Sequence, residues 1–167
     1  GLQGTTGATG LQGLAGSSAV PIPSGTTVVG VVSYDGHSAG VETGNDVICA
    51  DVDAGKIDAL QRNVIPIYEP GLEQLVERNQ KQGRLEFTTD VARAIADAEV
   101  VFIAVGTPPD EEGSADLRHV LAVAEQIGRH MMRELVVVTK STVPVGTAAK
   151  VQRAVAAHAR YPFHMCS

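Results

Sequence analysis

The chain has 167 residues, of which 44% are hydrophobic, 19% charged and 4% aromatic, and its net charge is −6. This length predicts one domain, and the negative charge argues against nucleic acid or an anionic membrane as partner. The two cysteines form no CxxC pair and indicate neither a disulfide framework nor a metal site. The sequence shows no signal peptide and no long apolar run, which favours a cytoplasmic protein.

Residues 1–18 form six Gly-X-Y triplets, the repeat of a collagen-like segment, because only glycine fits at the axis of a triple helix. No triplet contains proline, which pre-sets the backbone of stable collagen. Two interpretations stay open, namely a disordered low-complexity tail and a short trimerising stalk. We treat residues 1–24 as a tail and linker.

From residue 26 onward, β-branched or apolar runs alternate with segments whose apolar residues recur at helical spacing. Two of the helical segments follow residues that can cap a helix, Asp53 and Asp90. The predicted strands are 26–32, 47–50, 85–88, 100–105 and 135–139. The predicted helices are 53–62, 71–82, 91–95, 116–127 and 146–157. The apolar run 100–105 is typical of a central parallel strand, and the alternation predicts an α/β fold with a doubly wound parallel sheet.

Ligands of a doubly wound sheet bind at the carboxyl ends of its strands, so the residues that follow the predicted strands are candidates for binding. Asp51 closes the strand 47–50. A carboxylate there can accept hydrogen bonds from an adenosine ribose and repels a 2′-phosphate, which favours NAD over NADP. The plainer interpretation is an ordinary acidic residue at a strand-to-helix turn.

The segment Gly106-Thr107-Pro108-Pro109 follows the strand 100–105. Its glycine lets a ligand approach the backbone, and Thr107 offers a hydroxyl and a backbone N–H. A rigid loop is the plainer interpretation. The acidic residues 110–112 are interpreted as solvated surface, because no neighbouring residues supply the further ligands of a metal site.

Three runs are long and distinctive: PIYEPGL (66–72), FIAVGTPPDEEGSADL (102–117) and TKSTVPVGTA (139–148). On these runs, the stretch from about residue 45 to 156 resembles the N-terminal NAD-binding part of the UDP-glucose 6-dehydrogenases, a family of nucleotide-sugar dehydrogenases. The resemblance implies a Rossmann-like NAD-binding domain over residues 25–157, followed by an unassigned tail, 158–167. We interpret Tyr68–Gly71 as a structural turn before a helix.

The resemblance also implies roles for individual residues. The positions that match NAD-contacting residues of the family are Asp51, Lys56, Thr107 and Thr142. Thr142 corresponds to a threonine beside the nicotinamide and the reacting sugar carbon, where it assists. No catalytic residue is assigned, because the family's cysteine lies in a later part of the enzyme and Cys166 lacks its motif. Cys49 is interpreted as a core residue.

The implied reaction is the two-step oxidation of UDP-glucose to UDP-glucuronate by two NAD molecules, with a cysteine that captures the aldehyde. Such enzymes act in nucleotide-sugar metabolism and polysaccharide biosynthesis, and family members oligomerise. Because the chain resembles only the NAD-binding half, the resemblance implies a fragment that is inactive alone.

The start of the domain departs from the family pattern, in which a strand leads into a GxGxxG turn that admits the pyrophosphate. With Gly30 as the first glycine, the next two glycine positions hold Val32 and Asp35, which add bulk and negative charge. Residues 33–44 lack helical apolar spacing. We therefore expect a fold that is incomplete at its first strand–helix unit, with the strand present and the helix absent.

Other interpretations remain open. A GDP-mannose or UDP-N-acetylmannosamine dehydrogenase is the nearest alternative, because sugar specificity resides mainly outside the matched part. A structural or surface protein trimerised through residues 1–18 is an alternative of another class, although a working stalk needs many more than six triplets. A third alternative is a junction that joins a collagen-like sequence to a dehydrogenase gene.

Overall fold

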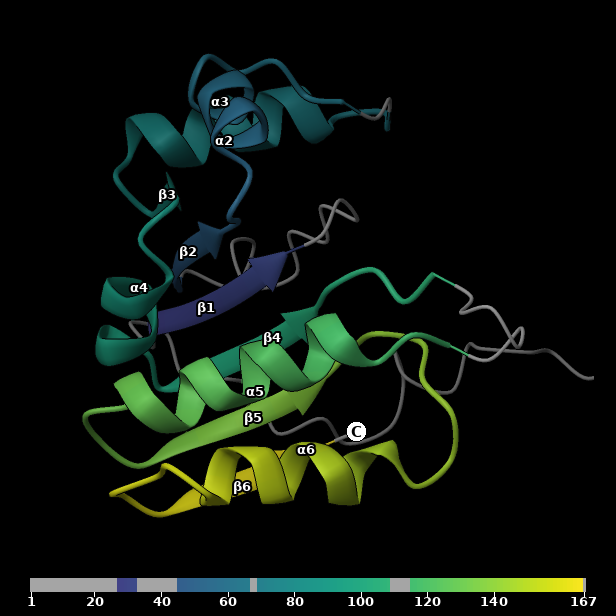
Figure 1. Ribbon diagram of the computed structural model, residues 1–167. Helices are drawn as coiled ribbons and strands as arrows, with labels where there is room; N and C mark the ends of the chain where they lie inside the picture. Colours follow the sequence, from purple (N-terminus) through teal and green to yellow (C-terminus); the bar gives the residue numbers. More distant parts are fainter. Residues whose placement is uncertain (1–26, 33–44, 67–68, 109–114, 167) are drawn as a thin grey trace, which may run out of the picture.

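The computed structural model describes residues 27–32, 45–66, 69–108 and 115–166. Within these residues, six parallel strands form one sheet, and helices lie between the successive strands from β2 to β6 (Figure 1). The strands are β1 (Thr27–Val32), β2 (Asp46–Ala50), β3 (Leu85–Thr88), β4 (Val100–Ala104), β5 (Leu135–Thr139) and β6 (Phe163–Cys166). The helices are α2 (Ala54–Gln61), α3 (Leu72–Lys81), α4 (Val91–Asp97), α5 (Arg118–His130) and α6 (Thr147–Ala156).

The order of the strands across the sheet is β3-β2-β1-β4-β5-β6. The central strand β1 pairs in parallel with β2 on one side and with β4 on the other. The chain builds the sheet outward from β1 first in one direction and then in the other, so the order reverses at β1. This is the doubly wound, Rossmann-like order, and it confirms the fold class predicted from the sequence.

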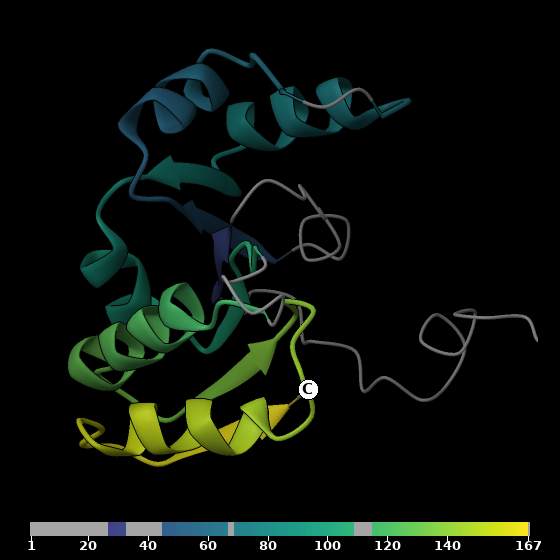
Figure 2. The ribbon, with the colours of Figure 1, turned by 45° about the vertical axis from the view of Figure 1, so that its right-hand side comes forward.

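Helices α4, α5 and α6 cover one face of the sheet (Figure 2). Their apolar side chains pack with inward-facing residues of β2, β4 and β5 in a main core. Fully buried members of this core include Ile95, Ile103, Ile127, Val137 and Val151. The continuous apolar sequence of β4 follows from this position, because a central strand is covered by protein.

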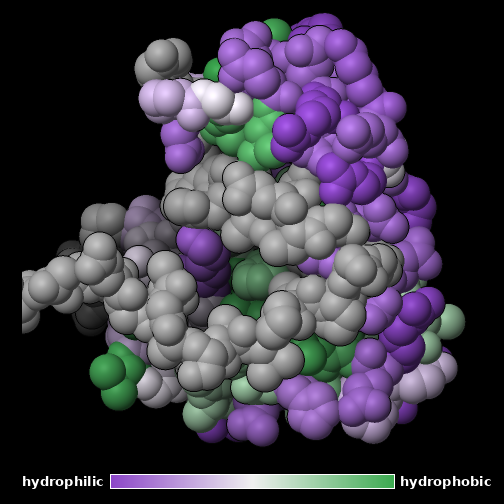
Figure 3. All heavy atoms as spheres, turned by 180° about the vertical axis from the view of Figure 1, so that it is seen from behind, coloured by the Kyte–Doolittle hydropathy of each residue, from purple (hydrophilic) through white to green (hydrophobic). Residues whose placement is uncertain are grey.

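Helices α2 and α3 cover the opposite face near the β3 edge. Side chains alternate along a strand, so Val47 and Cys49 of β2 point away from the main core and pack against a second cluster. That cluster consists of Ile57, Leu72, Val76, Leu85 and Phe87. The outer surface at the top of the molecule, over α2 and α3, is mostly hydrophilic (Figure 3). In the described part of the chain, no helix has the length and apolar character needed to cross a membrane.

The local signals in the sequence place most helix starts correctly. The Asp53 carboxylate accepts hydrogen bonds from the backbone N–H groups of Gly55 (2.9 Å) and Lys56 (3.1 Å), and Asp90 accepts one from Arg93 (2.9 Å). These side chains satisfy backbone donors that a first helical turn leaves unpaired, as expected for capping residues.

Glu69-Pro70-Gly71 forms the predicted turn before α3. Gly71 has φ +85°, and the Leu72 N–H donates to the Glu69 carbonyl at 3.1 Å. A left-handed backbone costs glycine little, because it has no Cβ to clash with the neighbouring carbonyl.

The structure differs from the sequence predictions at two described elements. The helix predicted from Asp116 begins at Arg118, and the Asp116 carboxylate accepts from the Arg118 N–H at 2.9 Å. The sequence predicts no element for 158–167, yet β6 pairs in parallel with β5. Four residues, two of them exposed, carry too short a pattern to identify this strand.

The beginning of the domain is only partly described. The predicted strand 26–32 is confirmed as β1 at the centre of the sheet. Gly30 lies inside this strand, opposite Cys49 on one side and Phe102 on the other, rather than in a turn. The expected tail, 1–24, and the expected loss of the first helix, in 33–44, fall outside the described residues.

Candidate functional site

Three of the predicted site residues follow the carboxyl ends of strands in the central part of the sheet. Asp51 comes directly after β2, Thr107 lies in the loop after β4, and Thr142 lies in the loop after β5. Parallel strands end on the same edge of the sheet, as the strand arrows show (Figure 1). The sheet therefore displays Asp51 on one side of β1 and the two threonines on the other, at the point where the strand order reverses.

Asp51 is held by the backbone around it. Its N–H donates to the Thr88 carbonyl at 3.1 Å, which extends the β2–β3 pairing by one residue. Its Oδ1 accepts from the Asp53 N–H at 2.9 Å, and its Oδ2 lies 3.4 Å from Nζ of Lys56. The side chain of Asp51 is 15% exposed and that of Lys56 is 36% exposed. A carboxylate fixed in this way presents a hydrogen-bond acceptor at the edge of the sheet.

The predicted pair Asp51 and Lys56 is thus brought together by the start of α2. Asp53 caps this helix, and its first turn places Lys56 back over the end of β2. From sequence spacing alone, Lys56 would be interpreted as a surface residue of a helix. The structure adds that its ammonium group faces the carboxylate that closes β2.

The loops after β4 and β5 contact each other directly. The Thr107 hydroxyl donates to the backbone carbonyl of Thr142 at 2.9 Å, although these residues are 35 positions apart. Ser141 makes a bond between the same loops, since its hydroxyl donates to the Val105 carbonyl at 2.8 Å. Ser141 has no signal of its own in the sequence beyond its position next to Thr142.

The residues that follow β1 are not part of the described site. Val32 is the last residue of β1, and Asp35 lies in the segment 33–44, outside the described residues. The acidic loop 110–112 also lies outside them. Within the described ranges, no group of three His, Cys, Asp or Glu side chains is placed to hold a metal ion.

The two cysteines differ in their surroundings. Cys49 lies in β2 beside the second cluster, and burial raises the pKa of its thiol to about 12. Cys166, at the end of β6, is exposed. Because the thiolate is the reactive form, Cys49 should be inert near neutral pH, as expected for a core residue.

We predict that one thiol of the folded chain reacts rapidly with iodoacetamide at pH 7.5 and that the other reacts much more slowly until the chain is unfolded. Peptide mass mapping should place the fast label on Cys166. A Cys166→Ser chain should lose the fast phase. Equal labelling rates for both cysteines in the folded chain would contradict the burial of Cys49.

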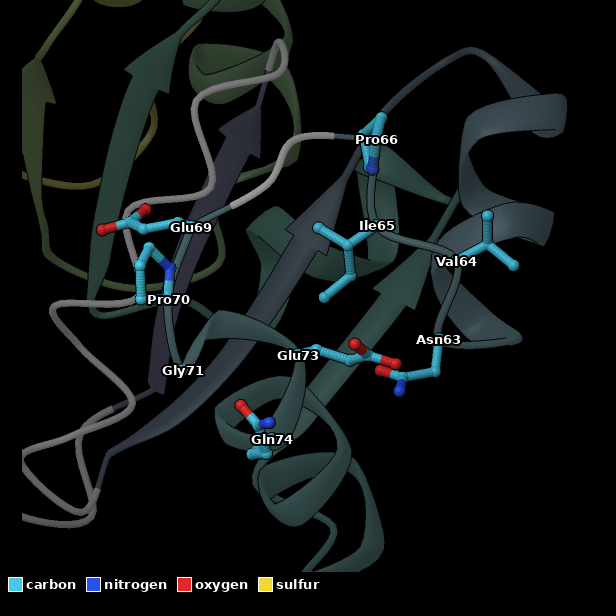
Figure 4. A pocket seen from close by; sticks show the side chains of 9 residues that line it. All are labelled: Asn63, Val64, Ile65, Pro66, Glu69, Pro70, Gly71, Glu73 and Gln74. Carbon is cyan, nitrogen blue, oxygen red and sulfur yellow. The ribbon is translucent and has the colours of Figure 1, made fainter.

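A hollow of about 550 Å³ lies elsewhere, between the end of α2 and the start of α3 (Figure 4). It is lined by Asn63, Val64, Ile65, Pro66, Glu69, Pro70, Gly71, Glu73 and Gln74. None of the four predicted site residues lines it. Because ligands of doubly wound sheets bind where the strand order reverses, we place the candidate site at the carboxyl ends around β1 and not in this hollow.

Comparisons with known proteins identify the family to which the chain belongs. A family model described as the UDP-glucose/GDP-mannose dehydrogenase family, NAD binding domain, matches residues 24–165. The match extends beyond the stretch 45–156 at both ends and includes β1 and most of β6.

Two curated relatives illustrate the similarity. A UDP-glucose 6-dehydrogenase of Bacillus subtilis is 48% identical over 145 residues, which are 86% of this chain and 31% of the relative. A UDP-glucose 6-dehydrogenase of Pseudomonas aeruginosa is 55% identical over 111 residues, 66% of this chain and 24% of the relative. The chain therefore spans about a quarter to a third of the length of these relatives.

Solved structures share the fold. A UDP-glucose dehydrogenase from Pyrobaculum islandicum superimposes with a TM-score of 0.78 and 40% identity, over 86% of this chain and 35% of that one. A ternary complex of GDP-mannose dehydrogenase from Pseudomonas aeruginosa superimposes with a TM-score of 0.71 and 33% identity. This similarity covers 83% of this chain and 34% of that one. With its strand order and its family match, the chain belongs to the UDP-glucose/GDP-mannose dehydrogenase family and represents the NAD-binding domain of that family.

Proposed function

We propose that this chain binds NAD across β1 and serves as the NAD-binding domain of a UDP-glucose 6-dehydrogenase. One observation carries the proposal: a fixed carboxylate and two hydroxyl-bearing loops stand on opposite sides of the strand at which the sheet order reverses. Dinucleotides bind across such a point in this class of fold.

The chemistry of these groups fits NAD. The Asp51 carboxylate can accept hydrogen bonds from both hydroxyls of the adenosine ribose, and Lys56 can donate to the same sugar. Thr107 and Thr142 would hold the nicotinamide half, because that half must lie beyond β1, over β4 and β5. When bound, NAD supplies the hydride acceptor for oxidation of an alcohol.

The substrate is proposed from the relatives. Those with the highest identity quoted above are UDP-glucose 6-dehydrogenases, so UDP-glucose is the proposed substrate and UDP-glucuronate the product. GDP-mannose is a second candidate substrate, because a GDP-mannose 6-dehydrogenase of Pseudomonas aeruginosa is 41% identical over 111 residues. The higher identity to the UDP-glucose enzymes favours UDP-glucose.

The proposed location of the protein is the cytoplasm.

Cofactor selectivity tests the proposal. We expect isothermal titration calorimetry to show NAD binding at least about tenfold tighter than NADP binding. A phosphate roughly 4 Å from a carboxylate is repelled by several kcal/mol at an effective dielectric constant near 20, and each 1.4 kcal/mol is tenfold in affinity. Equal or tighter binding of NADP would contradict the role of Asp51.

A separate prediction concerns catalytic turnover. Tested by itself, this 167-residue polypeptide should give no steady NADH formation with UDP-glucose and excess NAD. It spans a quarter to a third of the length of its relatives, and lost substrate positioning alone can forfeit about 7–11 kcal/mol of barrier reduction. Turnover that is absent from a mock purification and reduced in a Thr142→Ala chain would contradict this expectation.

A further inference from the structure

We propose that Ser141 is a positioning residue that sets the place of the nicotinamide half of the cofactor. Ser141 acts through the loops after β4 and β5, and the inference rests on the proposed binding of NAD. The observation that carries it is a pair of hydrogen bonds between these loops, which we call the loop clasp: Ser141 Oγ to the Val105 carbonyl and Thr107 Oγ1 to the Thr142 carbonyl.

The two bonds of the loop clasp run in opposite directions. Ser141, after β5, donates to Val105 at 2.8 Å and has a second, longer contact of 3.3 Å to the Ile103 carbonyl. Thr107, after β4, donates to Thr142 at 2.9 Å. A displacement of one loop along the other would therefore break both bonds, so the clasp fixes the relative position of the loops.

The loop clasp lies where the sheet no longer holds the two segments together. The β4–β5 pairing ends at Ile103 opposite Thr139. Just past that point, the backbone N–H groups of Lys140 and Ser141 both donate to the Ile103 carbonyl, at 2.9 and 3.1 Å. Beyond these backbone bonds, the side-chain hydroxyls of Ser141 and Thr107 join the two loops. Ser141 is half-buried and its hydroxyl contacts backbone carbonyls, which suits a residue that acts by holding the loops in place.

The loop clasp lies on only one side of β1. The adenosine half is assigned to Asp51 and Lys56 at the end of β2, and β1 separates β2 from β4 in the sheet. Loss of the Ser141 hydroxyl should therefore disturb contacts to the nicotinamide half and leave contacts to the adenosine half unchanged. A merely structural role of Ser141 predicts no such difference between the two halves.

The test compares NAD with ADP-ribose, which lacks the nicotinamide, by calorimetric titration of the full chain. In a Ser141→Ala chain we expect the Kd of NAD to rise about 3- to 10-fold, the loss typical of one neutral hydrogen bond, and the Kd of ADP-ribose to change by less than about twofold. Ser141→Thr keeps a hydroxyl and should bind NAD within about twofold of the unchanged chain. Unfolding midpoints are recorded for every chain.

Thr147→Ala is the matched control. Thr147 is the first residue of α6, and its hydroxyl donates to the Pro144 carbonyl at 2.7 Å. Loss of this hydroxyl therefore removes neither bond of the loop clasp. The ratio of the two Kd values should stay unchanged in this chain. If Ser141→Ala does not fold, Ser141→Cys, with a weak donor of similar size, replaces it.

Three results would overturn the inference: an equal loss for both ligands in Ser141→Ala, no loss for either, or a ratio that shifts equally in Thr147→Ala. Failure of the proposed function looks different, because the unchanged chain would then bind neither NAD nor ADP-ribose. In that case the proposed role of Ser141 would be rejected together with the proposed function.

Discussion

An Asp51→Ala chain should bind NAD about 10- to 100-fold more weakly than the unchanged chain. Hydrogen bonds to a charged group contribute about 1.5–3 kcal/mol each, and the substitution removes the carboxylate that would accept them from the ribose. It should also reduce the preference for NAD over NADP, because the group that repels a 2′-phosphate is gone. Calorimetric titration with both dinucleotides measures both effects.

Asp58→Ala is the control for the loss of negative charge, because Asp58 is an exposed residue of the same helix α2. Its affinity for NAD should stay within about twofold of the unchanged chain. Far-UV circular dichroism of both chains checks that α2 and its neighbours remain folded. An Asp51→Ala chain that is folded and binds NAD as tightly as the unchanged chain would rule out Asp51 as a ribose ligand.

A Gly128→Ala chain should be destabilised by about 2–3 kcal/mol, although alanine normally favours a helix. Gly128 lies in α5 where α6 approaches closely. A Cβ at this position would clash with the carbonyl oxygen of Val155 and would lie 3.1 Å from the carbonyl carbon. Backbone atoms cannot turn aside as a side chain can, so the two helices must separate and open the main core between them.

Urea unfolding followed by circular dichroism measures this loss, with Gly55→Ala as the matched control. Gly55 is also helical, but its added Cβ would meet only the Asp53 side-chain oxygen, at 3.2 Å. Its stability should change by less than about 1 kcal/mol, because one side chain can shift. A Gly128→Ala chain as stable as the unchanged chain would show that α5 and α6 are farther apart than the structure places them.

Much of the fold could be predicted from sequence because its signals are local. The apolar run Val100–Val105 identifies β4, and the aspartates at 53 and 90 mark the starts of α2 and α4. β6 could not be predicted in this way. Its four residues become a strand only because β5 offers an edge and because Phe163 and Met165 pack against the main core.

The candidate site is less visible in the sequence. Thr107 and Thr142 are proposed from a resemblance, but their direct contact depends on how two irregular loops meet, which no spacing encodes. Ser141 carries no signal of its own for the same reason, since its partner is a backbone carbonyl 36 positions away. The pairing of Lys56 with Asp51 is closer to local, because a capped helix start determines it.

The central claim is that NAD lies across β1, with its adenosine at Asp51 and its nicotinamide at the loop clasp. An amide chemical-shift map of the chain titrated with NAD tests this most directly. We predict shifts at Asp51–Lys56 and at Thr107 and Ser141–Thr142, and with ADP-ribose shifts at the first group only. Shifts confined to the hollow at Asn63–Gln74, or no saturable shifts at either group, would contradict the account.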